Sequence, residues 1–216
     1  MQRRFFHRLL SASAAAAILL APFFTPAWAA DEGADVVILK LSNEVLDSIK
    51  ADAAIKSGDI NRLIALVDSK IMPNVNFQRM TAASVGPGWR QATPEQKKRL
   101  QEEYKILLVR TYAGALSQVN DMTVSLKPMR AAPEGNEVVV RTEVRGRGNP
   151  EPVQLEYRVE KTPGEGLGWK IYDLNVMGVW LVSNYRGQFA QEVNAKGIDG
   201  LIAALVERNR VNAKKA

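Results

Sequence analysis

The spacing of hydrophobic residues predicts helices in the first half of the chain. Apolar side chains there recur every three or four positions, which is typical of amphipathic helices. We predict one helix over 35–56, a second that starts at Ile60 and ends at Pro73, and a short third helix around Phe77. The segment Thr93-Pro94-Glu95-Gln96 has the N-cap residue, the proline and the capping glutamine of a helix start, so we expect a long helix from there to about residue 118.

After Asn120 the hydrophobic period changes to two, which is typical of strands with one buried face. Four strands are predicted, and proline-glycine segments at 133–136 and 163–166 are typical of hairpin turns between them. The apolar positions of these strands are Val124, Leu126, Val138, Val140, Val144, Val153, Leu155, Tyr157, Val159, Tyr172, Leu174 and Val176. Two further helices are predicted over 183–194 and 198–208, with Gly197 between them.

This order of elements predicts an α+β fold. N-terminal helices are followed by a curved four-stranded antiparallel sheet and then by C-terminal helices, which pack on one face of the sheet. No repeat or low-complexity segment indicates a second domain.

Residues 1–29 have the features of an export signal. Arg3, Arg4 and Arg8 form its basic start, an apolar stretch follows, and Ala27-Trp28-Ala29 matches an Ala-x-Ala cleavage site. We expect the mature protein to comprise residues 30–216, as a single domain in the periplasm. The apolar stretch is shorter than a spanning helix and contains two prolines, which argues against a retained anchor. The paired arginines leave both Sec and twin-arginine export open.

Composition removes most catalytic chemistry from the mature chain. Cleavage after Ala29 removes three arginines and the only histidine, so the formal charge falls from +6 to +3 and neither Cys nor His is left. There is then no thiolate or imidazole nucleophile, metal site or Ser-His-Asp triad. Tyr172 and Asp173 could do acid–base chemistry, but neighbouring strand residues are expected to point to opposite faces. We therefore predict no catalytic residue, cofactor or metal.

Two groups of side chains have both a structural and a functional interpretation. The aromatic residues of the long helix, the strands and the penultimate helix could fill a core or line a ligand cavity. Likewise, Arg141, Arg145, Arg147 and Arg158 could simply be solvated strand residues or could form a patch for docking a partner.

Several segments in the right order resemble the MlaC/Ttg2D (toluene-tolerance) family of phospholipid-binding proteins. These are 76–81 (NFQRMT), 88–96 (GWRQATPEQ), 107–112 (LLVRTY), and the long stretch 168–189 that begins GWKIYD. Together they cover nearly all of the mature chain. Departures from the family pattern are Asn76, where aspartate is expected, the segment 85–88, and Trp180, at a position that is often serine.

The resemblance implies a function without catalysis. Members of the family are soluble periplasmic carriers that move phospholipid between an outer-membrane lipoprotein complex and an inner-membrane ABC transporter with its MCE-domain subunit, which maintains outer-membrane lipid asymmetry. A diacyl phospholipid and these two complexes are thus the expected partners, and we expect a monomer that does not bind nucleic acid. Two alternatives stay open: an isomerase or hydrolase on a cone-shaped α+β fold, and a periplasmic adaptor without a ligand.

The resemblance and the hydrophobic periodicity together suggest where lipid would bind. The acyl chains are expected in an apolar cavity between the sheet and the helices. The expected lining residues are Leu107, Leu108, Thr111, Val140, Val144, Leu155, Tyr157, Ile171, Tyr172, Leu174, Val176, Val179 and Leu181. Arg145 and Arg147 are the residues that we expect to dock partner complexes.

Overall fold

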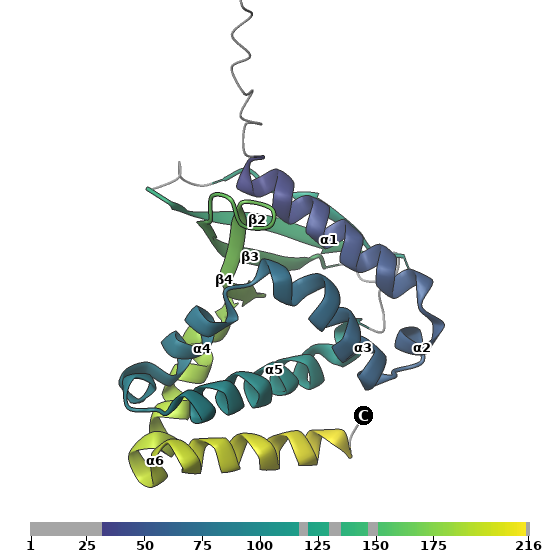
Figure 1. Cartoon of the computed structure of the whole chain (residues 1–216). Helices are drawn as coiled ribbons and strands as arrows, with labels where there is room; N and C mark the ends of the chain where they lie inside the picture. Colours follow the sequence, from purple (N-terminus) through teal and green to yellow (C-terminus); the bar gives the residue numbers. More distant parts are fainter. Residues whose placement is uncertain (1–31, 117–120, 130–134, 147–150, 215–216) are drawn as a thin grey trace, which may run out of the picture. The chain divides into compact units, whose positions relative to one another are not determined.

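Helical elements make up most of the described chain from Ala34 to Leu116, and an antiparallel sheet follows them (Figure 1). The computed structural model describes residues 32–116, 121–129, 135–146 and 151–214, all within the unit Asp31–Ala216. The helical elements before the sheet are α1 (Ala34–Ala51), α2 (Ala53–Lys56), α3 (Ile60–Leu66), η1 (Val67–Ile71), η2 (Met72–Asn74), α4 (Phe77–Val85), η3 (Gly86–Arg90) and α5 (Pro94–Leu116).

The first predicted helix is divided in two at Asp52. The backbone of Asp52 is extended, and the Asp52 carboxylate accepts hydrogen bonds from the amides of Ala54 (2.9 Å) and Ile55 (3.2 Å). The side chain therefore caps a new helix, α2, which the hydrophobic spacing over 35–56 could not distinguish from a continuation of α1.

The start of α5 agrees with the sequence prediction. The Gln96 amide donates to Thr93 Oγ1 (3.2 Å), and the Thr93 amide donates to Gln96 Oε1 (3.0 Å), which is a complete capping box. The helix then buries Leu100 and Tyr104 completely. Of the residues on its expected polar side, only Lys98 is exposed, and the others are partly buried: Lys97, Gln101, Glu102 and Lys105.

The sheet has five antiparallel strands, one more than predicted. In spatial order they are β1 (Thr123–Leu126), β2 (Glu137–Arg145), β3 (Val153–Lys161), β4 (Trp169–Val176) and β5 (Val179–Trp180). The additional strand, β5, has two residues and pairs with the end of β4 through a hairpin. So short a strand has too few residues to show an alternating pattern.

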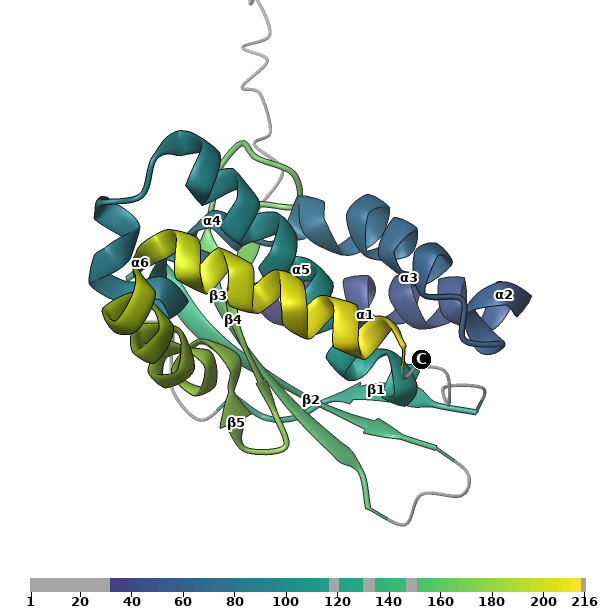
Figure 2. The same cartoon turned by 90° about the horizontal axis from the view of Figure 1, so that it is seen from below.

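The last helical element, α6 (Leu181–Ala213), is broken at Gly197, where φ is +68°. Two helices were predicted here, and the break lies where the sequence placed it. The second half of α6 runs along α5 (Figure 2). Although α5 and α6 are long, no helix in the described ranges has the combined length and hydrophobicity needed to cross a membrane.

Candidate functional site

The apolar residues of the sheet share one face, which we call the inner face. Cross-strand pairing aligns Val140 with Tyr157 and Tyr157 with Leu174. Directly paired residues point to the same side of a sheet, so these side chains form a continuous layer. Helix α1 packs across this face with Ile38 and other apolar residues.

Three hydrophobic clusters surround the inner face. The first joins α4, α5 and α6 and contains Tyr104, Tyr185 and Phe189, whose rings pack with centroids 5.1–5.5 Å apart. The second joins α1 to one end of the sheet, and the third joins α1, α2, α3 and η1 to α5. These three aromatic residues thus belong to a packed core.

A part of the inner face lies outside all three clusters. Val144, Val153, Leu155 and Val176 are only partly buried, and none of the clusters formed by the described residues includes them. Strand β3 is paired on both sides, yet Val159 is its only buried residue. A central strand normally buries its apolar face, so this stretch, which we call the uncovered strip, lacks part of its expected covering.

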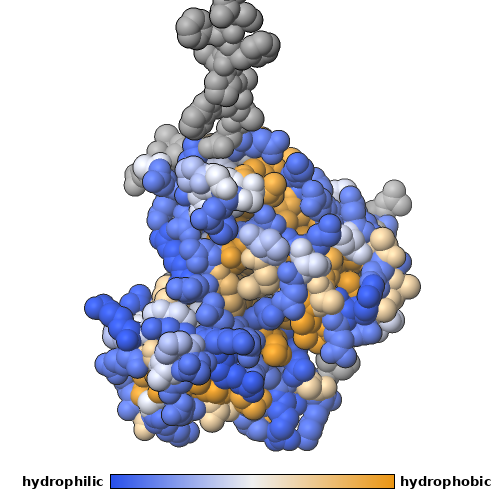
Figure 3. Space-filling model, in the orientation of Figure 1, coloured by the Kyte–Doolittle hydropathy of each residue, from blue (hydrophilic) through white to orange (hydrophobic). Residues whose placement is uncertain are grey.

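Partly exposed apolar residues also face the interior from the helices. Leu108, Tyr112 and Val182 lie at the margin of the first cluster and stay partly accessible. Apolar side chains gather on the molecular surface between α1 and α5 (Figure 3). The arrangement suits an apolar ligand, because contact with hydrocarbon would remove this surface from water.

The thirteen expected lining residues fall into four groups. Val140 and Ile171 are buried in the second cluster, and Leu107 and Leu181 in the first, so these four are core residues. The partly exposed inner-face or helix positions are Leu108, Val144, Leu155, Tyr157, Leu174 and Val176. Thr111 and Val179 are exposed, and Tyr172 lies elsewhere.

Tyr172 is on the opposite, polar face of the sheet, contrary to its expected place in the lining. The pairing of β3 with β4 skips this residue, since Arg158 pairs with Asp173 and Val159 with Ile171. Such a β-bulge interrupts the alternation on which the prediction depended.

The Tyr172 side chain belongs to a charged network. Its hydroxyl donates to Glu137 Oε2 (2.6 Å), and the Arg79 guanidinium lies 3.6 Å from the ring centroid. Arg79 also forms ion pairs with Glu137 and Glu160. Burial, reinforced by the Glu137 carboxylate, raises the pKa of Tyr172 to about 12, so the phenol stays a neutral hydrogen-bond donor.

Asp173 has a structural role beside the bulge. Its carboxylate is 1% exposed and accepts hydrogen bonds from Arg158 Nη1 (3.0 Å) and the amides of Leu174 (2.9 Å) and Val182 (3.1 Å). Burial raises its pKa, and these donors oppose the rise. Asp173 thereby ties the start of α6 to the sheet. Tyr172 and Asp173 share the polar face, which corrects the expectation of opposite faces, but each has separate partners.

A group of hydroxyls lies where α1 packs on the inner face. Thr142 is fully buried, and its Oγ1 has no hydrogen-bond partner of ordinary geometry among the described residues. The Tyr157 phenol lies close to Thr142 and to Ser42 of α1, and burial raises its pKa. Neutral hydroxyls at this position are compatible with a predominantly apolar ligand.

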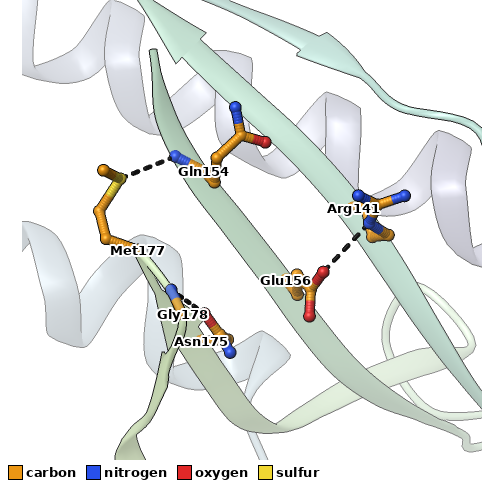
Figure 4. Close-up of a pocket in the computed structure, with 6 residues that line it drawn as sticks. All are labelled: Arg141, Gln154, Glu156, Asn175, Met177 and Gly178. Atoms are coloured by element: carbon orange, nitrogen blue, oxygen red, sulfur yellow. Dashed lines mark hydrogen bonds and ion pairs between the residues drawn. The ribbon is translucent and has the colours of Figure 1, made fainter. Parts of the chain in front are cut away.

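Two hollows with charged residues in their lining lie outside the inner face. One, of about 580 Å³, is lined by Arg141, Gln154, Glu156, Asn175, Met177 and Gly178 (Figure 4). Its charged groups, Arg141 and Glu156, form an ion pair of 3.1 Å with each other. The other, of about 530 Å³, includes Lys50 and Arg145. In the described part of the chain no three acidic, His or Cys side chains are grouped to hold a metal ion.

Of the two residues expected to dock partner complexes, the structure describes Arg145. The Arg145 side chain is exposed and donates from Nε to Glu143 Oε1 (2.7 Å). Arg147 lies outside the described residues. The expected site residues did not include Val153 of the uncovered strip, Val182 at the margin of the first cluster, or Met177 in the lining of the first hollow. Val153 could have been found, because it continues the alternation that selected Leu155.

An α+β fold whose central strand leaves apolar surface uncovered is compatible with the class of proteins that bind an apolar ligand, and comparison with known proteins specifies the family. A protein from Ralstonia solanacearum, described as phospholipid-binding and solved in complex with a phospholipid, is 44% identical; the match covers 84% of this chain and 99% of that one, with a TM-score of 0.78. The Pseudomonas putida toluene tolerance protein ttg2D is 30% identical, over 84% of this chain and 82% of its own length.

Two further matches agree. The intermembrane phospholipid transport system binding protein MlaC of Haemophilus influenzae is 21% identical over 79% of each chain. The sequence model of the MlaC protein family matches residues 39–207. The chain belongs to the MlaC family, which confirms the resemblance seen in its sequence. These relatives are named for phospholipid binding and transport, and not for an enzymatic activity.

Proposed function

We propose that this protein is a periplasmic phospholipid carrier. It carries lipid between an outer-membrane lipoprotein complex and an inner-membrane ABC transporter with an MCE-domain subunit. This transport maintains outer-membrane lipid asymmetry. The observation that carries the proposal is the uncovered strip on the inner face of β3, in a chain that is 44% identical to a protein solved with a phospholipid.

The physical chemistry of acyl chains supports a carrier. At about 0.8 kcal/mol for each buried methylene, roughly thirty methylenes of two chains would cost on the order of 20 kcal/mol to expose to water. Spontaneous release is therefore negligible. Transfer from a bilayer to an apolar interior exchanges one hydrocarbon environment for another, so its free energy can lie near zero. The direction of transfer is then set by the partner complexes.

Docking requires a separate surface. Arg145 is exposed at the end of β2, on the side of the strand away from Val144. A basic side chain here can orient an acidic partner without contacting lipid. Arg147, two residues further on, is proposed to act with it.

A transfer assay tests the proposed role. Protein loaded with isotope-labelled phospholipid is mixed with the reconstituted inner-membrane MCE-domain complex or with the outer-membrane lipoprotein complex, each in vesicles. We expect label to pass between protein and complex faster than between protein and vesicles alone. Equal rates with and without both complexes would contradict the shuttle, even if the protein binds lipid.

A further inference from the structure

Three hydroxyl-bearing side chains meet at the edge of the uncovered strip. Tyr157 pairs across the sheet with Val140, and Thr142 is the next inner-face residue after Val140 along β2. Diagonal neighbours on one face of a sheet lie within reach of an aromatic side chain. Ser42 lies on α1, which packs across the same face, and the Tyr157 phenol lies close to the hydroxyls of both Thr142 and Ser42. We call Ser42, Thr142 and Tyr157 the hydroxyl triad.

The triad has unused hydrogen-bonding capacity. Each hydroxyl offers one donor and two acceptor sites. Thr142 is fully buried, and its Oγ1 has no hydrogen-bond partner of ordinary geometry among the described residues. A buried hydroxyl without a partner costs free energy, so it normally marks the place of a ligand or an ordered water. Burial raises the pKa of Tyr157, which keeps the phenol a neutral donor.

The triad borders the uncovered strip directly. Thr142 pairs with Leu155 of the strip, and Leu155 is also the inner-face residue that precedes Tyr157 along β3. Tyr157 and Ser42 are only partly buried, so a ligand that lies on the strip can reach them. Helix α1, which carries Ser42, borders the apolar surface seen in Figure 3. The triad therefore lies between the strip and the helix at the edge of that surface.

A diacyl phospholipid would bring matching acceptors to this place. It has two ester carbonyls between its headgroup and its chains. A carbonyl accepts hydrogen bonds and donates none, and moving it from the hydrated membrane surface into an apolar interior costs free energy unless a protein donor replaces water. The side chains of the strip, which are Val144, Val153, Leu155 and Val176, contain no polar atom. The triad supplies donors beside them.

We propose that the hydroxyl triad binds an ester carbonyl of the lipid and so fixes the glycerol region at the edge of the uncovered strip. The inference rests on the proposed carrier function and adds to it a preference for acyl esters. Tyr157 Oη donates to the carbonyl oxygen. Thr142 and Ser42 position the phenol, and Thr142 Oγ1 donates to Tyr157 Oη. Every diacyl phospholipid has this carbonyl, so the contact does not depend on the headgroup.

The contact predicts a preference for ester over ether lipid. An ether phospholipid with the same headgroup and chain length keeps the hydrocarbon but lacks the carbonyls, so the phenol loses its acceptor. One net hydrogen bond changes an equilibrium constant about two- to tenfold. From vesicles that contain equal amounts of both lipids, we expect the wild-type protein to take up about fivefold more ester than ether lipid.

Tyr157→Phe and Thr142→Val test the proposal. The first removes only the hydroxyl, and the second keeps the β-branched shape of the side chain. Mature protein is equilibrated with vesicles of dioleoyl phosphatidylcholine and its diether analogue, and the bound lipids are counted by mass spectrometry. Tyr112→Phe is the matched control, because Tyr112 is also a partly buried tyrosine but lies on α5 at the margin of the first cluster.

We expect Tyr157→Phe to abolish the ester preference, Thr142→Val to reduce it, and Tyr112→Phe to leave it unchanged. The wild-type protein taking up both lipids equally would overturn the ester contact and leave the carrier function intact. The same conclusion would follow if the preference survived in folded Tyr157→Phe or Thr142→Val, or disappeared in Tyr112→Phe.

Total uptake separates the contact from a structural role of the triad. A loss of ester and ether lipid by the same factor in both triad variants, with the preference kept, would show that the hydroxyls only support the fold, and would overturn the proposal. A wild-type protein that takes up neither lipid would overturn the carrier function and the ester contact together.

Discussion

Truncation of Leu155 distinguishes a lipid-facing residue from a core residue, with Val140→Ala as the comparison. Both side chains are on the inner face of neighbouring strands, and the sequence pattern treats them alike. Val140 is fully buried in the second cluster, whereas Leu155 is partly exposed in the uncovered strip.

The structure predicts that Val140→Ala mainly lowers the stability of the protein, whereas Leu155→Ala mainly weakens lipid binding. Val140→Ala removes two buried methyl groups and should lower the free energy of unfolding by about 2 kcal/mol, with little change in lipid binding. Leu155→Ala leaves less of a cavity, so the lipid-free protein should lose only about 1 kcal/mol. Its lost contact with acyl chains should weaken lipid binding by about 1 to 2 kcal/mol, roughly tenfold.

Denaturant unfolding of delipidated protein and lipid competition measure the two quantities. A charge at the same position, Leu155→Asp, should reduce lipid occupancy further, because it cannot be solvated among acyl chains. The reasoning is refuted if Leu155→Ala destabilises the lipid-free protein as much as Val140→Ala does, or if folded Leu155→Asp keeps its full lipid load.

Three further predictions concern the polar face. Tyr172→Phe should cost about 1 kcal/mol of stability through the lost bond to Glu137 and leave lipid content unchanged, as denaturation and lipid quantification would show. Hydrogen bonds from Arg145, and to a smaller extent from Lys127, hold the pKa of Glu143 at about 2. The stability that Glu143 contributes is therefore present above its ordinary pKa of 4.5 and is lost as the pH falls toward 2. NMR titration should show that the pKa of Glu143 rises in Arg145→Gln. Arg145→Glu should slow association with partner complexes most at low salt and leave bound lipid unchanged; lost lipid with intact partner binding would contradict this role.

Local signals in the sequence predicted much of the fold. The capping residues Thr93 and Gln96 make the bonds that their identities suggested, and the change of period after Asn120 marks the helix-to-sheet transition. Gly197 ends one helix and precedes another because it accepts a positive φ. Each of these features depends on a few neighbouring residues.

Features that depend on distant contacts were not predictable. Alternation identifies an inner face but cannot distinguish buried Val140 from partly exposed Leu155, since that difference depends on which helices cover each strand. The bulge at Tyr172 shifts the alternation by one residue, and nothing in the local pattern marks it. The uncovered strip therefore becomes visible only in the folded structure.

The central claim is that the interior of this protein holds a phospholipid. Native mass spectrometry of mature protein released gently from the periplasm tests it most directly, followed by lipid extraction to identify what is bound. We predict a complex with the added mass of one diacyl phospholipid and a mixture of headgroups, because the inner face is lined mainly by apolar side chains. Protein that is recovered without lipid, and that acquires none from vesicles, would contradict the claim.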